Sequence, residues 1–175
     1  MNVAILLPEE REMNLVTFGE RLEKEIVKED IEASESGLIL TPKDISIKVV
    51  GQTSLLADEF LSLKIELEAT VDFDAFKESS YEIECIFKSV LRDVGMVYDD
   101  LSSEIWMPEE TIWTTEFEGQ FVKIEKAKPI YVIASKAIKA PERNMTLIKS
   151  ALDLYGNELE LLIIKHGGSI EKFKK

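Results

Sequence analysis

The segment ISIKVVGQTSLL, residues 45–56, gives the strongest indication of the fold. β-Branched residues dominate Ile45–Gly51, which predicts a buried strand, and Thr53–Leu61 predicts a short helix directly after it. Gly51 would let the backbone approach a ligand closely. Because the first N–H groups of a helix favour an anion, this turn can hold a phosphate.

The next predicted strand carries two carboxylates on one side. Residues 68–74 alternate between apolar and polar, so Asp72 and Asp74 project from the same face, about 6–7 Å apart at the backbone. Their oxygens can converge on one Mg²⁺ ion, which usually keeps substrate phosphates as further ligands. The same pattern is also typical of a solvated strand face. We expect Ile45–Gly51 and Ala69–Ala75 to be neighbouring strands of one mixed sheet.

The remaining pattern predicts helices and strands around this pair. The order of elements predicts an α+β fold in which a mixed sheet is flanked by helices. We expect a single domain over residues 1–175, with its core at about 45–128 and a helical C-terminal part at about 129–175. The other predicted elements are a helix over 12–29, a loop over Ala33–Gly37, a helix over 79–95 with Phe87 and Leu91 inward, a strand over Ser103–Met107, a hairpin turning at Gly119, and helices over Ile130–Lys139, Glu142–Leu154 and Glu158–His166.

Composition and charge exclude several classes of protein. The net charge is -13, from 34 acidic and 21 basic residues. General DNA binding needs a basic face that displaces counterions from phosphates, so only a local basic patch remains compatible with this charge. The single cysteine, Cys85, needs no oxidising compartment. With no apolar run near the ~20 residues of a membrane span and no signal peptide, we expect no membrane association and a cytoplasmic location.

The order of these motifs resembles the nucleotidyltransferase superfamily. The closer likeness is to its minimal bacterial and archaeal branch, which includes the abortive-infection toxin nucleotidyltransferases. In that branch the pattern reads roughly Gly-Gly-Thr-x-Leu, followed further along by Arg-x-Thr-x-Asp-x-Asp. The resemblance covers about residues 45–155. The matching residues are Gly51, Thr53, Leu55, Thr70, Asp72 and Asp74.

The resemblance implies a Mg²⁺-dependent enzyme that transfers a nucleotide from an NTP to an RNA or protein acceptor. Carboxylates around bound metal would stabilise the attacking and leaving oxygens of the displacement. Glu104 competes with Glu125 as the third carboxylate, and the sequence leaves this choice open. The implied site residues are Asp72 and Asp74 for the metal, Glu125 as third acid, Gly51, Gln52, Thr53 and Ser54 for the phosphates, and Lys136 to offset phosphate charge.

Three features depart from the pattern of this branch, and one is that Arg143-Asn144-Met145-Thr146 follows Lys136 where acidic residues are expected. Gln52 stands where a second glycine is expected, and Glu68 stands where an arginine is expected. Each change weakens nucleotide binding, so we expect the isolated protein to bind NTP weakly. The alternative hypothesis is a catalytically degenerate interaction or regulatory module, such as half of a toxin–antitoxin pair that binds a partner protein.

Overall fold

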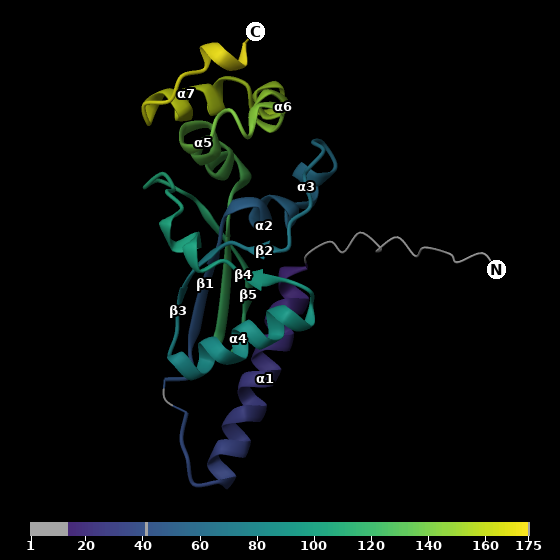
Figure 1. Cartoon of the computed structure of the whole chain (residues 1–175), viewed down its shortest axis with the longest axis vertical. Helices are drawn as coiled ribbons and strands as arrows, with labels where there is room; N and C mark the ends of the chain where they lie inside the picture. Colours follow the sequence, from purple (N-terminus) through teal and green to yellow (C-terminus); the bar gives the residue numbers. More distant parts are fainter. Residues whose placement is uncertain (1–13, 41, 175) are drawn as a thin grey trace, which may run out of the picture.

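The computed structural model describes residues 14–40 and 42–174, which form a four-stranded mixed sheet with helices on one face and beyond one end (Figure 1). This arrangement confirms the predicted α+β class. The helices are α1 Leu15–Glu35, α2 Gly51–Leu56, α3 Glu59–Ser62, α4 Tyr81–Asp93, α5 Pro129–Lys139, α6 Met145–Tyr155 and α7 Asn157–Lys165, with 3-10 turns η1 Asp100–Glu104 and η2 Glu171–Phe173. The strands are β1 Ile45–Val49, β2 Asp72–Phe73, β3 Ala75–Glu78, β4 Val97–Tyr98, β5 Trp113–Glu118 and β6 Val122–Ala127.

The main sheet has the strand order β3-β1-β6-β5. β1 runs antiparallel to β3 and parallel to β6, and β5 pairs antiparallel with β6 through the predicted hairpin. The C-terminal helices α5, α6 and α7 lie beyond one end of this sheet (Figure 1). Across residues 14–40 and 42–174, none of the helices is both long enough and apolar enough to cross a bilayer.

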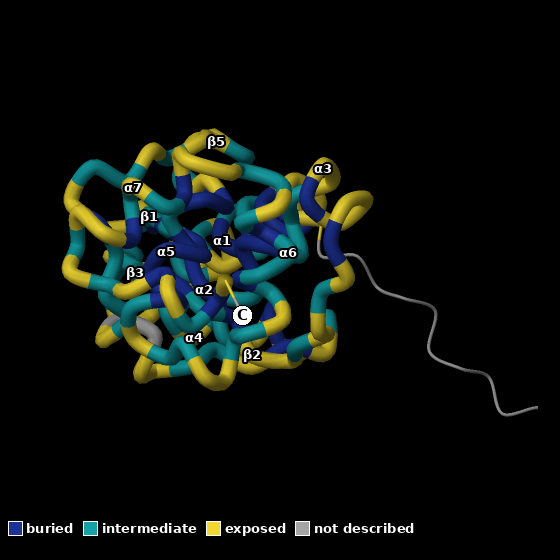
Figure 2. The backbone as a smooth tube through the Cα atoms, turned by 90° about the horizontal axis from the view of Figure 1, so that it is seen from above, coloured by how far each residue is buried: buried dark blue, intermediate teal, exposed yellow. Residues whose placement is uncertain are grey.

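The C-terminal helices form one of two hydrophobic clusters, around α5. Pro129 opens α5 at a position where its missing N–H has no helical partner to lose. Val132, Ile133 and Ala137 of this helix are buried against α2, α6 and α7. Figure 2 shows α5 near the centre of this end of the molecule, with exposed segments around it. Because α5 follows directly after β6, its burial fixes its position beyond the end of the sheet where β6 ends.

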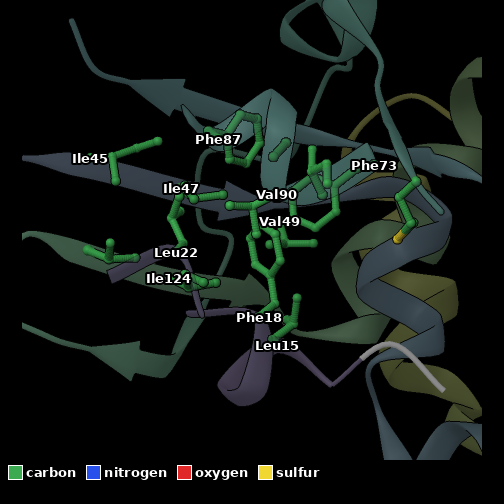
Figure 3. Close-up of a cluster of buried hydrophobic side chains, with 14 of the residues drawn as sticks. Leu15, Phe18, Leu22, Ile45, Ile47, Val49, Phe73, Phe87, Val90 and Ile124 are labelled. Carbon is green, nitrogen blue, oxygen red and sulfur yellow. The ribbon is translucent and has the colours of Figure 1, made fainter. Parts of the chain in front are cut away.

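The second cluster lies between the sheet and helices α1 and α4, and is drawn in Figure 3. Its centre is three phenylalanines, with ring centroids 5.4 Å apart for Phe18–Phe73, 6.1 Å for Phe18–Phe87 and 5.8 Å for Phe73–Phe87. Such aromatic pairs contribute about 0.5–1.5 kcal/mol each beyond the burial of their area. Ile47 and Val49 of β1 pack into the same cluster, as expected for a buried strand.

The prediction that Ala69–Ala75 lies beside Ile45–Gly51 in one mixed sheet is wrong for all but its last residue. Of that range only Ala75 pairs with β1, opposite Val49, whereas Asp72–Phe73 pairs in parallel with β4 in a separate two-stranded sheet. The cause is a change of partner at Asp74, because the carbonyls just before it accept N–H groups from the β4 segment instead of β1. The family resemblance therefore gains no support from this pairing.

Other predicted boundaries also differ. Asp58 caps a new helix by accepting the N–H of Leu61, so the predicted helix Thr53–Leu61 is two helices, α2 and α3. Ser103–Met107 is not a strand, because η1 occupies Asp100–Glu104 and irregular chain follows.

The first helix begins where the side chain of Asn14 accepts the N–H of Thr17, and it extends to Glu35, so most of the predicted loop Ala33–Gly37 is helical. The predicted start of this helix, residues 12–13, lies outside the described residues. The helix predicted over 79–95, with Phe87 and Leu91 inward, and the three C-terminal helices are confirmed.

The β5–β6 hairpin is held to α1 by one carboxylate. Glu23 accepts the N–H groups of Gln120, Phe121 and Val122 at 2.9–3.2 Å. Consecutive N–H groups that point to one site form a concave anion-binding nest. Here an internal carboxylate fills the nest, and it joins the hairpin to the helix.

Replacement of Glu23 by alanine is expected to lower the free energy of unfolding by about 1–3 kcal/mol, because three backbone donors lose their acceptor. Urea denaturation followed by circular dichroism measures this change. Glu20→Ala is the matched control, since Glu20 is exposed on the same helix, and it is expected to change stability by less than ~0.5 kcal/mol. Equal losses for both variants would show that the nest contributes nothing.

Candidate functional site

A cavity of 510 Å³ lies between the segment that carries Asp72 and Asp74 and the last turns of α5. Cavities of about 300–1,000 Å³ are typical of small-molecule sites. Its walls differ in charge. The sheet side and its loops supply the carboxylates of Glu68, Asp72, Asp74, Asp99 and Glu104, whereas α5 and the turn after it supply Lys136, Lys139 and Arg143.

Asp74 is a half-buried carboxylate of this cavity that is held by a backbone hydrogen bond. Its Oδ2 accepts the N–H of Gln52 at 3.0 Å. Burial raises the pKa of Asp74, while the Gln52 hydrogen bond and the Lys136 ammonium act in the lowering direction, and Asp99 and Asp72 add to the raising effect. A carboxylate with a raised pKa would gain from a cation close to its free oxygen.

Lys136 faces the same cavity from α5. Burial lowers the pKa of Lys136, and Arg143 adds to this effect, while Asp74 and Glu68 act in the opposite direction. Among the described residues, Lys136 makes no ion pair with a carboxylate within 4.0 Å. Lys136 and Asp74 are therefore two partly desolvated opposite charges that line one cavity without contact.

The position of the Asp74 carboxylate requires a glycine at residue 51. Its φ angle is +61°, in the left-handed region that favours glycine, and a Cβ atom at this position would overlap the Asp74 carboxylate. The N–H of the next residue, Gln52, already binds that carboxylate. The turn predicted to hold phosphate therefore holds an internal anion, although Gly51 and Gln52 both line the cavity.

Thr53 and Ser54 lie inside the protein, away from the cavity. Both are fully buried. The hydroxyl of Thr53 donates to the carbonyl of Asp72 at 2.8 Å, and that of Ser54 donates to the carbonyl of Ala127 at 2.9 Å. These hydroxyls join α2 to the neighbouring strands, so their contacts are structural.

The structure does not bring Glu125 to the cavity. Because Val122 and Ile124 of β6 point into the core, Glu125 projects from the opposite face, where it pairs with Lys123 at 3.1 Å. Glu104, the other candidate for third acid, lines the cavity. Within the described part of the chain, no group of three or more His, Cys, Asp or Glu side chains could hold a metal ion.

A pair of carboxylates still fits Mg²⁺, since this ion is usually bound by one or two carboxylates together with substrate phosphates and water. Asp72 and Asp74 are the residues that would hold it. Asp72 is exposed and Asp74 is half-buried, and both line the cavity.

Three charged residues of the cavity were missed by the sequence analysis, namely Asp99, Lys139 and Arg143. Lys139 follows Lys136 by three positions, a spacing that places both on one face of a helix and that would have been sufficient to find it. The Lys139 ammonium lies 5.6 Å from the ring centroid of Trp106, which also lines the cavity. No local signal pointed to Asp99.

In comparisons with known proteins, no protein-family model, no curated protein and no solved structure matches this chain. The site is therefore defined by its own geometry: carboxylates on one side, cations on the other, and an internal carboxylate at the start of α2.

Replacement of Gly51 by alanine is expected to destabilise the fold more than Gly37→Ala, the matched control. Gly37 also has a positive φ, +75°, but an added Cβ meets nothing within 4 Å, so its cost is the backbone term alone, about 1–2 kcal/mol. Gly51→Ala adds an overlap with Asp74. Urea midpoints measure both changes. Equal destabilisation would show that Asp74 moves aside freely.

Replacement of Asp74 by asparagine is expected to stabilise the protein at pH 7. The folded state raises the pKa of Asp74, so the ionised carboxylate opposes folding once the pH exceeds that raised value. Asparagine keeps an acceptor for the Gln52 N–H without the charge. The gain should shrink as the pH falls from the raised pKa towards 3.8, the ordinary Asp value, and vanish below 3.8, where the carboxyl is protonated in both states. Urea denaturation across this range tests it, and a pH-independent difference would contradict it.

Proposed function

We propose that this chain binds a nucleoside triphosphate with Mg²⁺ in the 510 Å³ cavity and transfers a nucleotide from it to an RNA or protein acceptor. The observation that carries the proposal is the separation of Asp74 from Lys136. Both groups are partly desolvated, with shifted pKa values, yet they make no ion pair. A ligand that brings a cation to the Asp74 carboxylate and an anion to the Lys136 ammonium would replace the solvation that both groups lose on burial.

A complex of Mg²⁺ with a triphosphate carries both charges, because the metal would lie at Asp74 and the phosphates at Lys136. Bound Mg²⁺ supplies neutralisation and polarisation of the phosphates, and Asp72 and Asp74 are the residues that would hold it. Lys136 would donate hydrogen bonds to phosphate oxygens as a compact charge, and Arg143 can bind two oxygens with its planar guanidinium. The proposal includes a cytoplasmic location, because the lone Cys85 needs no oxidising compartment.

Two features oppose tight binding by the isolated chain. The protein carries a net charge of -13, which repels a polyanion, and Glu68 adds a carboxylate to the cavity. The Gln52 side chain also donates to the Glu68 carbonyl at 2.8 Å, so it occupies space at the cavity wall. Binding then depends on Mg²⁺ and on the cations from α5 and the following turn.

A second function is favoured by a different observation. The N–H of Gln52 is already bound to Asp74, and Glu125 lies outside the cavity. The turn that the family resemblance implies for phosphate binding is therefore occupied, and Glu125 does not serve as the third acid. The chain would then be a catalytically degenerate interaction or regulatory module, for example half of a toxin–antitoxin pair.

Calorimetric titration with ATP and CTP, in Mn²⁺ or Mg²⁺ at low salt, distinguishes these functions. Lys136→Met and the double variant Asp72→Asn/Asp74→Asn are each expected to weaken binding at least tenfold, because one charge-assisted contact contributes about 1.5–3 kcal/mol. Lys123→Met is the control, since Lys123 lies on the far face of β6 beside Glu125. Equal binding by wild type and the Asp variant would show that the carboxylate pair is irrelevant.

If the wild type binds too weakly to measure, the variant Glu68→Arg with Gln52→Gly provides the second arm. It replaces an anion by a cation and clears the cavity wall, so binding should strengthen by tenfold or more. A folded double variant that still binds no NTP would reject nucleotide transfer and favour the interaction module.

A further inference from the structure

The edge strand β5 is open on its outer side. It pairs with β6 alone, and among residues 14–40 and 42–174 no backbone hydrogen bond joins it to any other segment. Figure 2 shows β5 along the rim of the molecule, and Thr114, Thr115 and Glu118 are exposed. Unpaired strand edges are templates for pairing with another chain, and β5 is such an edge with one irregularity of register, between Thr115 and Phe117.

A second cavity, of 340 Å³, lies beside this edge. Thr114 and Glu116 line it from β5, so side chains of a strand added to β5 would lie next to it. Phe60 of α3 lines it from another side and is 57% exposed, which is high for a phenylalanine. Tyr155, at the end of α6, adds a second aromatic side chain.

The lining of this cavity is acidic by one charge, with three carboxylates against two lysines, and this excess favours a cationic ligand. Its carboxylates are Asp58, Glu116 and Glu158, and its cations are Lys126 and Lys128. The buried Lys126 is already satisfied by the Ala57 carbonyl at 2.9 Å, Glu116 at 3.3 Å and Asp58 at 3.5 Å. Glu158 and Lys128 are both exposed and make no ion pair within 4.0 Å among the described residues. Glu118 of β5 is likewise exposed without such a pair, so the strand edge adds a further negative charge.

We propose that β5 and the second cavity together dock an extended, basic segment of a partner protein. The segment would add a strand to the β5 edge, whose backbone groups supply affinity, and it would place an arginine or lysine side chain in the cavity. The cavity lining supplies two aromatic side chains, Phe60 and Tyr155, to which such a cation can bind, and the carboxylate of Glu158. This site does not depend on nucleotide binding in the first cavity.

A second copy of this chain is a poorer occupant of the same edge. Two β5 strands placed side by side would bring Glu116 and Glu118 of one copy close to those of the other. Like charges across a strand pair are destabilising. Each copy also carries a net charge of -13, which opposes self-association.

Hydrogen exchange of the full chain, with two blocked probe peptides, tests the proposal. A peptide of alternating valine and arginine is expected to slow amide exchange over Trp113–Glu118, and a peptide of alternating valine and glutamate is not. The variant Phe60→Ser/Glu158→Lys should weaken binding of the arginine peptide at least tenfold. The matched control is Tyr81→Ser/Glu82→Lys, which changes an exposed aromatic and an exposed acid in the first turn of α4. It should retain binding within about twofold.

Three outcomes would overturn the proposal. The arginine peptide could fail to protect β5, or both variants could lose binding equally, which would indicate non-specific attraction to an acidic surface. Protection of β5 that rises with protein concentration, without any peptide, would show that a second copy occupies the edge. If the double variant fails to fold, Glu158→Lys alone provides the same comparison, because Glu158 is exposed.

Discussion

Burial of Phe73 is the constraint on which the rest of this structure depends. Its ring is fully buried between Phe18 and Phe87, and it lies between Asp72 and Asp74 in the chain. Because successive side chains of an extended segment point to opposite sides, a buried Phe73 forces both carboxylates away from the core. The alternative register would bury two carboxylates, which is costly without partners. The core therefore creates the acidic wall of the first cavity.

Asp74 transmits this constraint to α2. Once Asp74 is placed, its carboxylate binds the Gln52 N–H and leaves room for only a hydrogen atom at Gly51. Thr53 and Ser54 then fasten α2 to the strands on either side. A glycine followed by small hydroxyl residues is thus explained here by internal hydrogen bonds, which shows why such a turn alone is weak evidence for a phosphate site.

The sequence was informative where structure is decided locally. The helices over 79–95 and 129–166 follow from apolar periodicity and caps, and the hairpin follows from the turn at Gly119. The partner of a strand is decided by distant segments, so the switch at Asp74 from β4 to β1 was not predictable. Asp99 reaches the cavity through the same tertiary pairing. The position of Glu125 could have been predicted from the alternation of side chains along a strand. Val122 and Ile124 are apolar and face the core, so Glu125 must project from the opposite face.

Helix α5 connects the two cavities. Its first residues, Pro129 and Ile130, line the cavity beside β5, and Lys136 and Lys139 in its last turns line the cavity that contains Asp74. The helix between them is almost entirely buried, and a packed helix moves as a unit more readily than it bends. A segment bound at β5 would therefore touch the same rigid element that supplies the cations of the first cavity. The position of Lys136 opposite Asp74 therefore depends on the packing of α5 against α2, α6 and α7, and not on an ion pair between the two charges.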